Sequence, residues 1–239
     1  MNTASTIRIF FYLLWFISLL IQASFTELTA DEAYYWMYAQ DLSWGYFDHP
    51  PVIAALIKSG YALFCNELGV RLIPVILSTL TIVFLEKIVN AKEVKTFFML
   101  VASVGILHFI GFFAIPDSPF ICLSAAFLLV YKNYLASPDV KKSILLGCIF
   151  ALMCMSKYHA VVLIGLTVLS NPKLLSNRHF WLSGLIATGL LAPHFLWQFN
   201  AGFPSFQYHL FERSAAPYEL TYTLEYLASQ LFVLGPITG

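Results

Sequence analysis

The sequence predicts an all-α protein that crosses a membrane several times. Of its 239 residues, 59% are hydrophobic and only 11% are charged, whereas soluble domains carry about 25% charged residues. The apolar residues gather in long runs, and a membrane-spanning helix takes about 20 of them. Residues 29–51 depart from this pattern, because they concentrate acidic and aromatic side chains directly after the first run. We therefore exclude a soluble core and expect a polytopic bundle with an interfacial helix in its first outer loop.

About eight spans are expected, in a single membrane domain that covers residues 1–239. In chain order they are residues 7–25, 70–89, 95–115, 119–136, 142–156, 158–170, 180–199 and 223–239. The first is expected to be a retained signal anchor, because its apolar run is long for a cleaved signal peptide. A shorter apolar segment, 52–65, is expected to be re-entrant or interfacial. The last run ends at Gly239 without a flanking charge, so the chain is expected to be a fragment of a longer protein.

The basic residues predict how the chain is threaded, because Lys and Arg favour the cytoplasmic side. If Arg8 is cytoplasmic, later basic groups lie on that side as well, namely Lys87, Lys92, Lys95, Lys132, Lys141, Lys142, Lys173 and Arg178. The opposite side is expected to hold Glu27, Asp31, Glu32, Asp41, Asp48, Glu67, Asp117, Glu212, Glu219 and Glu225. Loops that are far apart in the sequence can then meet at one extracytoplasmic site.

The segment Thr29-Ala30-Asp31-Glu32 has the pattern of a capping box, with Thr29 as N-cap and Glu32 reaching back from the third helical position. This interpretation gives Asp31 a structural role, because an acid in the first turn favours the helix dipole. The alternative is a functional role, since acidic residues beside a membrane helix are costly to place. The aromatic residues that follow suit a helix lying at the membrane interface, and they are Tyr34, Tyr35, Trp36 and Tyr38.

Three further polar positions have both a structural and a functional interpretation. Asp48 and His49 precede two prolines, so they mark a rigid helix entry, or they bind an anion, an acceptor or a divalent metal. Asp117 lies between two prolines and is either an N-cap or a site residue. Lys157 lies on the expected outer side, where it either snorkels or binds an anionic phosphate.

The other polar side chains indicate no site. His108 and His194 lie within apolar runs and are expected to be packed or hydrogen-bonded rather than catalytic. The cysteines show no CxxC spacing, so neither a disulfide nor a zinc ribbon is expected at Cys65, Cys122, Cys148 and Cys154. The net charge of +0 indicates neither a nucleic-acid partner nor a polybasic lipid site.

Four motifs together resemble those of a known family: DEAYYW (31–36), GYFDHPP (45–51), PDSP (116–119) and SKYHAV (156–161). In this order and spacing they are similar to the bacterial GT-C glycosyltransferases, relatives of dolichyl-phosphate-mannose protein mannosyltransferases and lipid A aminoarabinose transferases. The resemblance implies a multi-pass enzyme of the bacterial inner membrane with an extracytoplasmic active site. Its donor would be a polyprenyl-phosphate-linked sugar, and its acceptor a hydroxyl of a lipid, glycan or protein. Members are usually about twice as long, so the C-terminal part is expected to be missing here.

By position in these motifs, the resemblance implies that Asp31 is the general base and that Asp117 orients the sugar or acceptor. The expected binding residues are Glu32, Tyr34, Tyr35, Asp48, His49, Lys157 and Tyr158. His49 and Lys157 would balance the donor phosphate, although His49 stands where many relatives have lysine, and its charge varies near neutral pH. No cofactor is expected with certainty; a divalent metal at Asp48 is left open.

Two other classes of function stay open: a transporter or flippase of a lipid-linked substrate, and an inactive truncated chain. Transporters place charged groups along a path inside the membrane and often contain inverted repeats. The acidic residues here lie in expected outer loops, and the sequence contains no visible inverted repeat. These features favour the enzyme.

Overall fold

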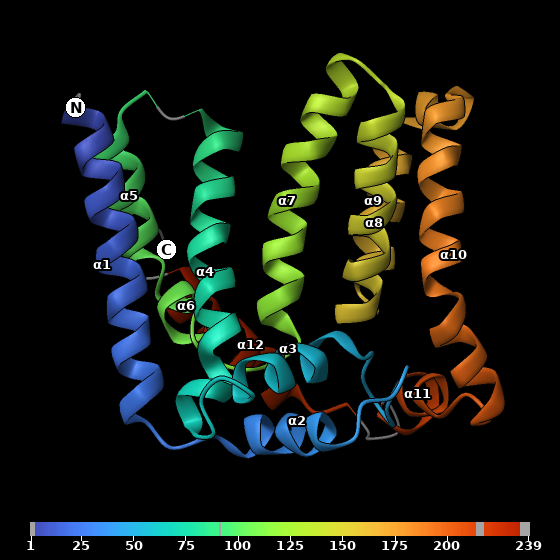
Figure 1. Cartoon of the computed structure of the whole chain (residues 1–239), viewed down its shortest axis with the longest axis horizontal. Helices are drawn as coiled ribbons and strands as arrows, with labels where there is room; N and C mark the ends of the chain where they lie inside the picture. The colour runs from blue at the N-terminus through green and yellow to red at the C-terminus, as the bar shows by residue number, and fades with distance from the viewer. Residues whose placement is uncertain (1–2, 91, 214–217, 235–239) are drawn as a thin grey trace.

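The computed structural model describes residues 3–90, 92–213 and 218–234, and within these ranges the chain forms helices and no strand. The principal helices stand in a row across the molecule (Figure 1). From one edge to the other they are α1 (Thr3–Phe25), α4 (Glu67–Val89), α7 (Asp117–Ala136), α8 (Val140–Ser156) and α10 (Arg178–Asn200). The short helices α5 (Val94–Ser103) and α9 (Ala160–Ser170) pack on α1 and α8 respectively.

The connecting helices lie mainly at one end of this row. Figure 1 places α2 (Ala30–Gln40) and α3 (Val52–Tyr61) across that end, together with α11 (Pro204–Gln207). A π-helical turn, η2 (Tyr208–Glu212), follows α11 directly. The remaining elements are α6 (Gly105–Phe109), the 3₁₀ turn η1 (Pro172–Ser176) and α12 (Leu220–Leu234), of which α12 packs on α6.

Four of the described helices, α1, α4, α7 and α10, are long and apolar enough to cross a membrane. This confirms the prediction of an all-α polytopic membrane protein. The predicted spans 142–156 and 158–170 correspond to α8 and α9, which are shorter. The segment 52–65 forms α3, which lies beside α2 at the end of the row as an interfacial helix would (Figure 1). The prediction 223–239 corresponds to α12, and its last five positions lie outside the described residues.

The prediction of one continuous span over 95–115 is wrong. Here α5 ends at Ser103, the backbone of Val104 is extended, and the single turn of α6 follows. The side chain of His108 lies 2.8 Å from the Ala102 carbonyl oxygen, so the break is bridged by a side chain. Gly105 is the first residue of the short turn and Gly111 follows its end, and glycine is a weak helix former. Apolarity predicted that this segment is buried, but it could not predict that the helix is interrupted.

The α8–α10 contact depends on a glycine that lets the two helices approach closely. A β-carbon added to Gly147 would lie 2.7 Å from the Ser183 carbonyl oxygen and 2.8 Å from Cβ of Ile186. Small residues allow close helix packing in membranes, where apolar burial alone does not drive association. This contact fixes α10 against the centre of the molecule, and α10 carries side chains that reach the candidate site.

The two ends of the row differ in charge. The connections α4–α5 and α7–α8 lie at the end where the chain begins (Figure 1). Most of the basic residues expected there lie in these connections or in the adjoining ends of the helices. Three acidic residues join them: Glu86 accepts hydrogen bonds from Arg8 and Tyr12, Asp139 caps α8, and Glu93 precedes α5. One end of the row therefore carries basic residues with a few acidic counter-ions, and the other end carries most of the acidic residues.

Cysteine labelling tests the predicted threading. In a variant with Cys65 replaced by Ser, we expect a membrane-impermeant maleimide to label Asp41→Cys from outside and to miss Lys141→Cys until the membrane is permeabilised. Both positions are exposed, and they lie at opposite ends of the row. Labelling of Lys141→Cys in sealed cells would show that the predicted orientation is the wrong way round.

Candidate active site

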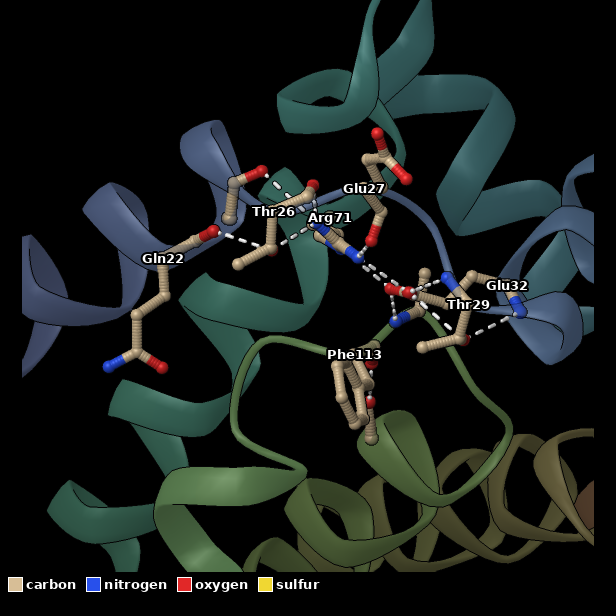
Figure 2. Close-up of polar contacts among 10 residues, drawn as sticks. Gln22, Thr26, Glu27, Thr29, Glu32, Arg71 and Phe113 are labelled. Carbon is tan, nitrogen blue, oxygen red and sulfur yellow. Dashed lines mark hydrogen bonds and ion pairs between the residues drawn. The ribbon is translucent and has the colours of Figure 1, made fainter.

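A buried arginine joins the segments that meet at the acidic end of the molecule (Figure 2). Nη1 of Arg71 donates to the Thr26 carbonyl and hydroxyl oxygens, both at 2.7 Å, and Nη2 donates to the Glu27 carbonyl at 2.7 Å. Nε and Nη2 also donate to the two carboxylate oxygens of Glu32, at 2.7 and 2.6 Å. The ring of Phe112 lies 5.2 Å from the guanidinium carbon. Arg71 therefore ties the end of α1 and the start of α2 to α4.

Glu32 completes this cluster from the other side. The predicted capping box is confirmed, because the Thr29 side chain accepts from the Glu32 amide and the Glu32 carboxylate accepts from the Thr29 amide at 2.9 Å. The same carboxylate accepts from the amide of Ala114 at 3.0 Å. Burial alone would raise the pKa of Glu32, but the hydrogen bonds from Arg71, Thr29 and Ala114 hold it below its usual value. The side chain is fully buried. Its contacts are with the protein, and substrate binding by Glu32 stays a prediction.

The Glu32 cluster determines where the two predicted catalytic acids lie. Asp31 directly precedes Glu32, and its side chain is exposed. Asp117 lies shortly after Ala114, in the first turn of α7. The N-cap of α7 is Pro116, so the interpretation of Asp117 as N-cap is wrong. Its carboxylate instead accepts a hydrogen bond from Nζ of Lys157 at 2.6 Å.

Tyr35 lies where the acidic residues converge. Its side chain is only 8% exposed, and its hydroxyl lies 3.4 Å from Nε2 of His49. Burial raises the pKa of Tyr35, and the negative charges of Asp48, Asp31 and Asp117 raise it further. Since a carboxylate must be near to act on this phenol, Asp31 in α2, Asp48 after α2 and Asp117 at the start of α7 all lie in the neighbourhood of Tyr35. Tyr35 itself remains a neutral hydrogen-bonding group.

The Asp48 carboxylate is the centre of a second polar network. Oδ1 accepts from the hydroxyls of Tyr34 and Tyr38, both at 3.0 Å, while Oδ2 lies 2.9 Å from Nδ1 of His49. Although burial would raise the pKa of Asp48, the contact with His49 and the tyrosine hydroxyls lower it. The carbonyl of Asp48 lies 2.7 Å from Nε2 of His209 in η2. Asp48 thus joins α2 to the segment after α10.

A cationic cavity of about 410 Å³ opens beside this network. It is lined by His49, Lys157, Tyr158, His159, Val162, His209 and Arg213. Burial lowers the pKa of His159, and the nearby positive charges of Lys157, His209 and Arg213 lower it further. The basic side chains of Lys157 and Arg213 in the lining suit an anionic ligand. Asp31 and Asp117 do not line this cavity; Asp117 adjoins it through Lys157.

Sequence analysis missed several of these residues. Arg71, His159, His209 and Arg213 occupy the site, yet none was predicted to have a role in it. Arg71 and Arg213 carried one detectable signal, because both are basic residues on the side predicted to be extracytoplasmic, where basic residues are disfavoured. His159 lies within the SKYHAV motif, which was its signal, whereas the sequence contained no comparable signal for His209.

A protein metal site needs several ligand side chains close together. Among the described residues, no group of three or more His, Cys, Asp and Glu side chains is placed to hold one. The cysteines Cys65, Cys122, Cys148 and Cys154 are free thiols.

Comparison with known proteins identifies the family. Residues 48–197 match the family model described as dolichyl-phosphate-mannose-protein mannosyltransferase. The chain belongs to this family. The match covers more than half of the 239 residues and includes Asp48, His49, Asp117 and Lys157, while Asp31 and Glu32 precede it. No match was found among curated proteins or among solved structures. Family membership supports a membrane glycosyltransferase of the mannosyltransferase type.

The Arg71–Glu32 pair predicts how stability depends on pH. Because the pKa of Glu32 is lowered in the folded protein, the pair stabilises the fold above the ordinary carboxyl pKa, and this contribution is lost as the pH falls through the lowered value. Arg71→Met leaves a buried carboxylate unpaired, which typically costs about 3–5 kcal/mol. We expect thermal unfolding in detergent to show this loss at pH 7, and a smaller loss at pH 4. Lys58→Met, which removes an exposed cation, is the control; an equal loss there would contradict the special role of Arg71.

Proposed function

We propose that this chain is the membrane part of a glycosyltransferase that takes its sugar from a polyprenyl-phosphate-linked donor. The acceptor is a hydroxyl group of a lipid, glycan or protein. Transfer takes place at the extracytoplasmic face of the bacterial plasma membrane, where the acidic loops converge. The family supports glycosyl transfer in general, and the donor, acceptor and face are our inference.

The observation that carries this proposal is the cationic cavity beside converging carboxylates. Lys157, Arg213 and three histidines line the cavity, while Asp31, Asp48 and Asp117 act together on Tyr35. A phosphate-linked sugar needs both: positive groups for the phosphate and a carboxylate for the attacking hydroxyl. Arg213 has no ion-pair partner among the described residues, so its guanidinium is available to an anion.

In the proposed reaction Asp31 is the general base. Its carboxylate accepts the proton of the acceptor hydroxyl while the hydroxyl oxygen forms a bond to the anomeric carbon. The bond from that carbon to the phosphate oxygen breaks, and polyprenyl phosphate leaves with the electron pair. Attack from the face opposite the phosphate inverts the anomeric centre. The exposed carboxylate of Asp31, which makes no hydrogen bond or ion pair in the described part of the chain, is suited to this proton transfer.

The other residues hold the reacting groups in place. Lys157 and Arg213 stabilise the charge that develops on the leaving phosphate, with His49 beside them. Asp117 keeps Lys157 oriented through the 2.6 Å contact. Asp48 fixes His49 by approaching Nδ1, which leaves Nε2 facing the Tyr35 hydroxyl. Tyr34, Tyr35 and Tyr158 provide the aromatic and hydroxyl surfaces that a sugar contacts.

Replacement of Asp31 tests the base assignment. We expect Asp31→Asn to lower turnover by about 10²–10⁴-fold, because asparagine cannot accept the proton, while folding stays normal because asparagine is tolerated at a helix start. The measurement is release of polyprenyl phosphate from a labelled polyprenyl-phosphate sugar in membranes. Asp41→Asn changes an exposed acid at the other end of α2 and should be neutral. Normal turnover of a well-folded Asp31→Asn chain would leave Asp31 only its structural role as an acid in the first turn of α2.

Substitution of Glu32, the neighbour of Asp31, is expected to have a different effect. Glu32→Gln preserves the shape of the capping box, so the sequence alone predicts a mild effect. In the structure this substitution also removes the only acidic partner of buried Arg71 among the described residues. We therefore expect Glu32→Gln to lower the amount of folded protein, in contrast to Asp31→Asn.

Arg213 tests the phosphate site separately from the base. A hydrogen bond to a charged group contributes about 1.5–3 kcal/mol, so we expect Arg213→Gln to weaken binding of decaprenyl phosphate by roughly 10- to 150-fold. Lys58→Gln removes a cation that lies away from the cavity and donates to the Gln40 carbonyl, and it is the matched control. If Arg213→Gln bound decaprenyl phosphate with unchanged affinity, the cavity would not be the phosphate site.

A further inference from the structure

Helix α10 buries two polar side chains that the transfer chemistry does not use. His194 and Gln198 are 2% and 0% exposed. They lie one turn apart on the same face of the helix. Polar side chains inside a membrane-spanning helix are costly and mark functional positions by default.

The partners lead from α10 to the candidate site. Nε2 of Gln198 donates to the hydroxyls of Tyr158 and Ser205, at 2.9 and 2.7 Å. Nε2 of His194 lies 3.3 Å from the Tyr158 hydroxyl. Nδ1 of His194 lies 2.6 Å from the Trp44 carbonyl oxygen, which can only accept. Nδ1 therefore carries the proton, so in the neutral ring Nε2 accepts from Tyr158.

Tyr158 lies between two different cavities. Its ring lines the cationic cavity of about 410 Å³ and also an apolar cavity of about 290 Å³. The apolar one is formed by residues such as Val161, Leu191, Phe195 and Phe206. The hydroxyl of Tyr158 accepts from Gln198 and donates to His194, so its orientation at the junction is determined by α10.

The same network holds the segment that carries Asp48 and His49. This segment follows α2 without regular secondary structure, so its backbone carbonyls need other partners. The Tyr46 carbonyl accepts from the Ser205 hydroxyl at 2.8 Å, and Ser205 in turn is held by Gln198. The Trp44 carbonyl is likewise bound by His194. Two backbone carbonyls of the segment that carries Asp48 and His49 are therefore bound by side chains from α10 and α11.

We propose that His194 and Gln198 are positioning residues for the transfer reaction. Through Tyr158 they orient a hydroxyl at the junction of the two cavities, and through Trp44 and Ser205 they fix the segment that carries Asp48 and His49. The inference rests on the proposed function, because it assigns these residues to the transfer reaction. On this proposal α10 helps to align the substrate, although its side chains line the apolar cavity and not the cationic one.

A double-mutant cycle tests this role. We expect Gln198→Met and Tyr158→Phe each to lower kcat/KM about tenfold, and the double variant to be no worse than the poorer single variant, because both remove the same oriented hydroxyl. Two independent structural defects would add instead, and additive losses would overturn the proposal. Gln207→Met, which removes an exposed amide bonded to the Gly202 carbonyl, is the matched control and should leave kcat/KM unchanged.

Hydrogen exchange tests the second part without any substrate. We expect the amides of residues 43–49 to exchange at least tenfold faster in His194→Phe than in the unaltered protein, while the amides of α4 exchange at the same rate. Unchanged exchange in this segment would overturn the positioning role of His194. If the unaltered protein released no polyprenyl phosphate, the proposed function would fail, and the exchange result would still decide whether α10 positions this segment.

Discussion

The candidate site depends on one buried ion pair, between Arg71 and Glu32. Both side chains are fully buried, and their hydrogen bonds reach the end of α1, the start of α2 and the segment before α7. A buried charge is tolerated only when its partner and its hydrogen bonds are in place. Movement of any of the three segments would leave one of these polar groups without a partner. The acidic end of the molecule is therefore held by electrostatics and not by apolar packing alone.

The ion pair with Arg71 distinguishes Glu32 from its neighbour Asp31. Consecutive residues of a helix point in directions about 100° apart, so Asp31 faces solvent while Glu32 faces Arg71. The buried acid also holds the amide of Ala114, shortly before Asp117. One carboxylate thus joins the start of α2 to the segment before α7, and the other is left exposed. Two neighbouring acids therefore have opposite environments.

Local signals were sufficient for much of the fold, and long-range partners were not predictable. Neighbouring residues were enough to predict the capping box at Thr29 and the long apolar helices. The structure contains both, the helices being α1, α4, α7 and α10. The partner of Glu32 lies 39 positions away in the sequence, and no periodicity indicates it. The break between α5 and α6 was missed because hydropathy measures burial and not continuity. His194 was correctly expected to be hydrogen-bonded, but its link to Trp44 is a tertiary contact.

The order in which the chain is made bears on how the site assembles. The carbonyl of Asp48 is paired with His209, which follows 161 positions later. Ribosomes add about 5–20 residues per second, so roughly 8–32 s separate the synthesis of these two residues. Until His209 is made, the segment that carries Asp48 lacks its contacts from α10 and η2, whereas Arg71 is made early enough to anchor the start of α2 first. The contacts of Asp48 with the later helices are therefore the last part of the site to form.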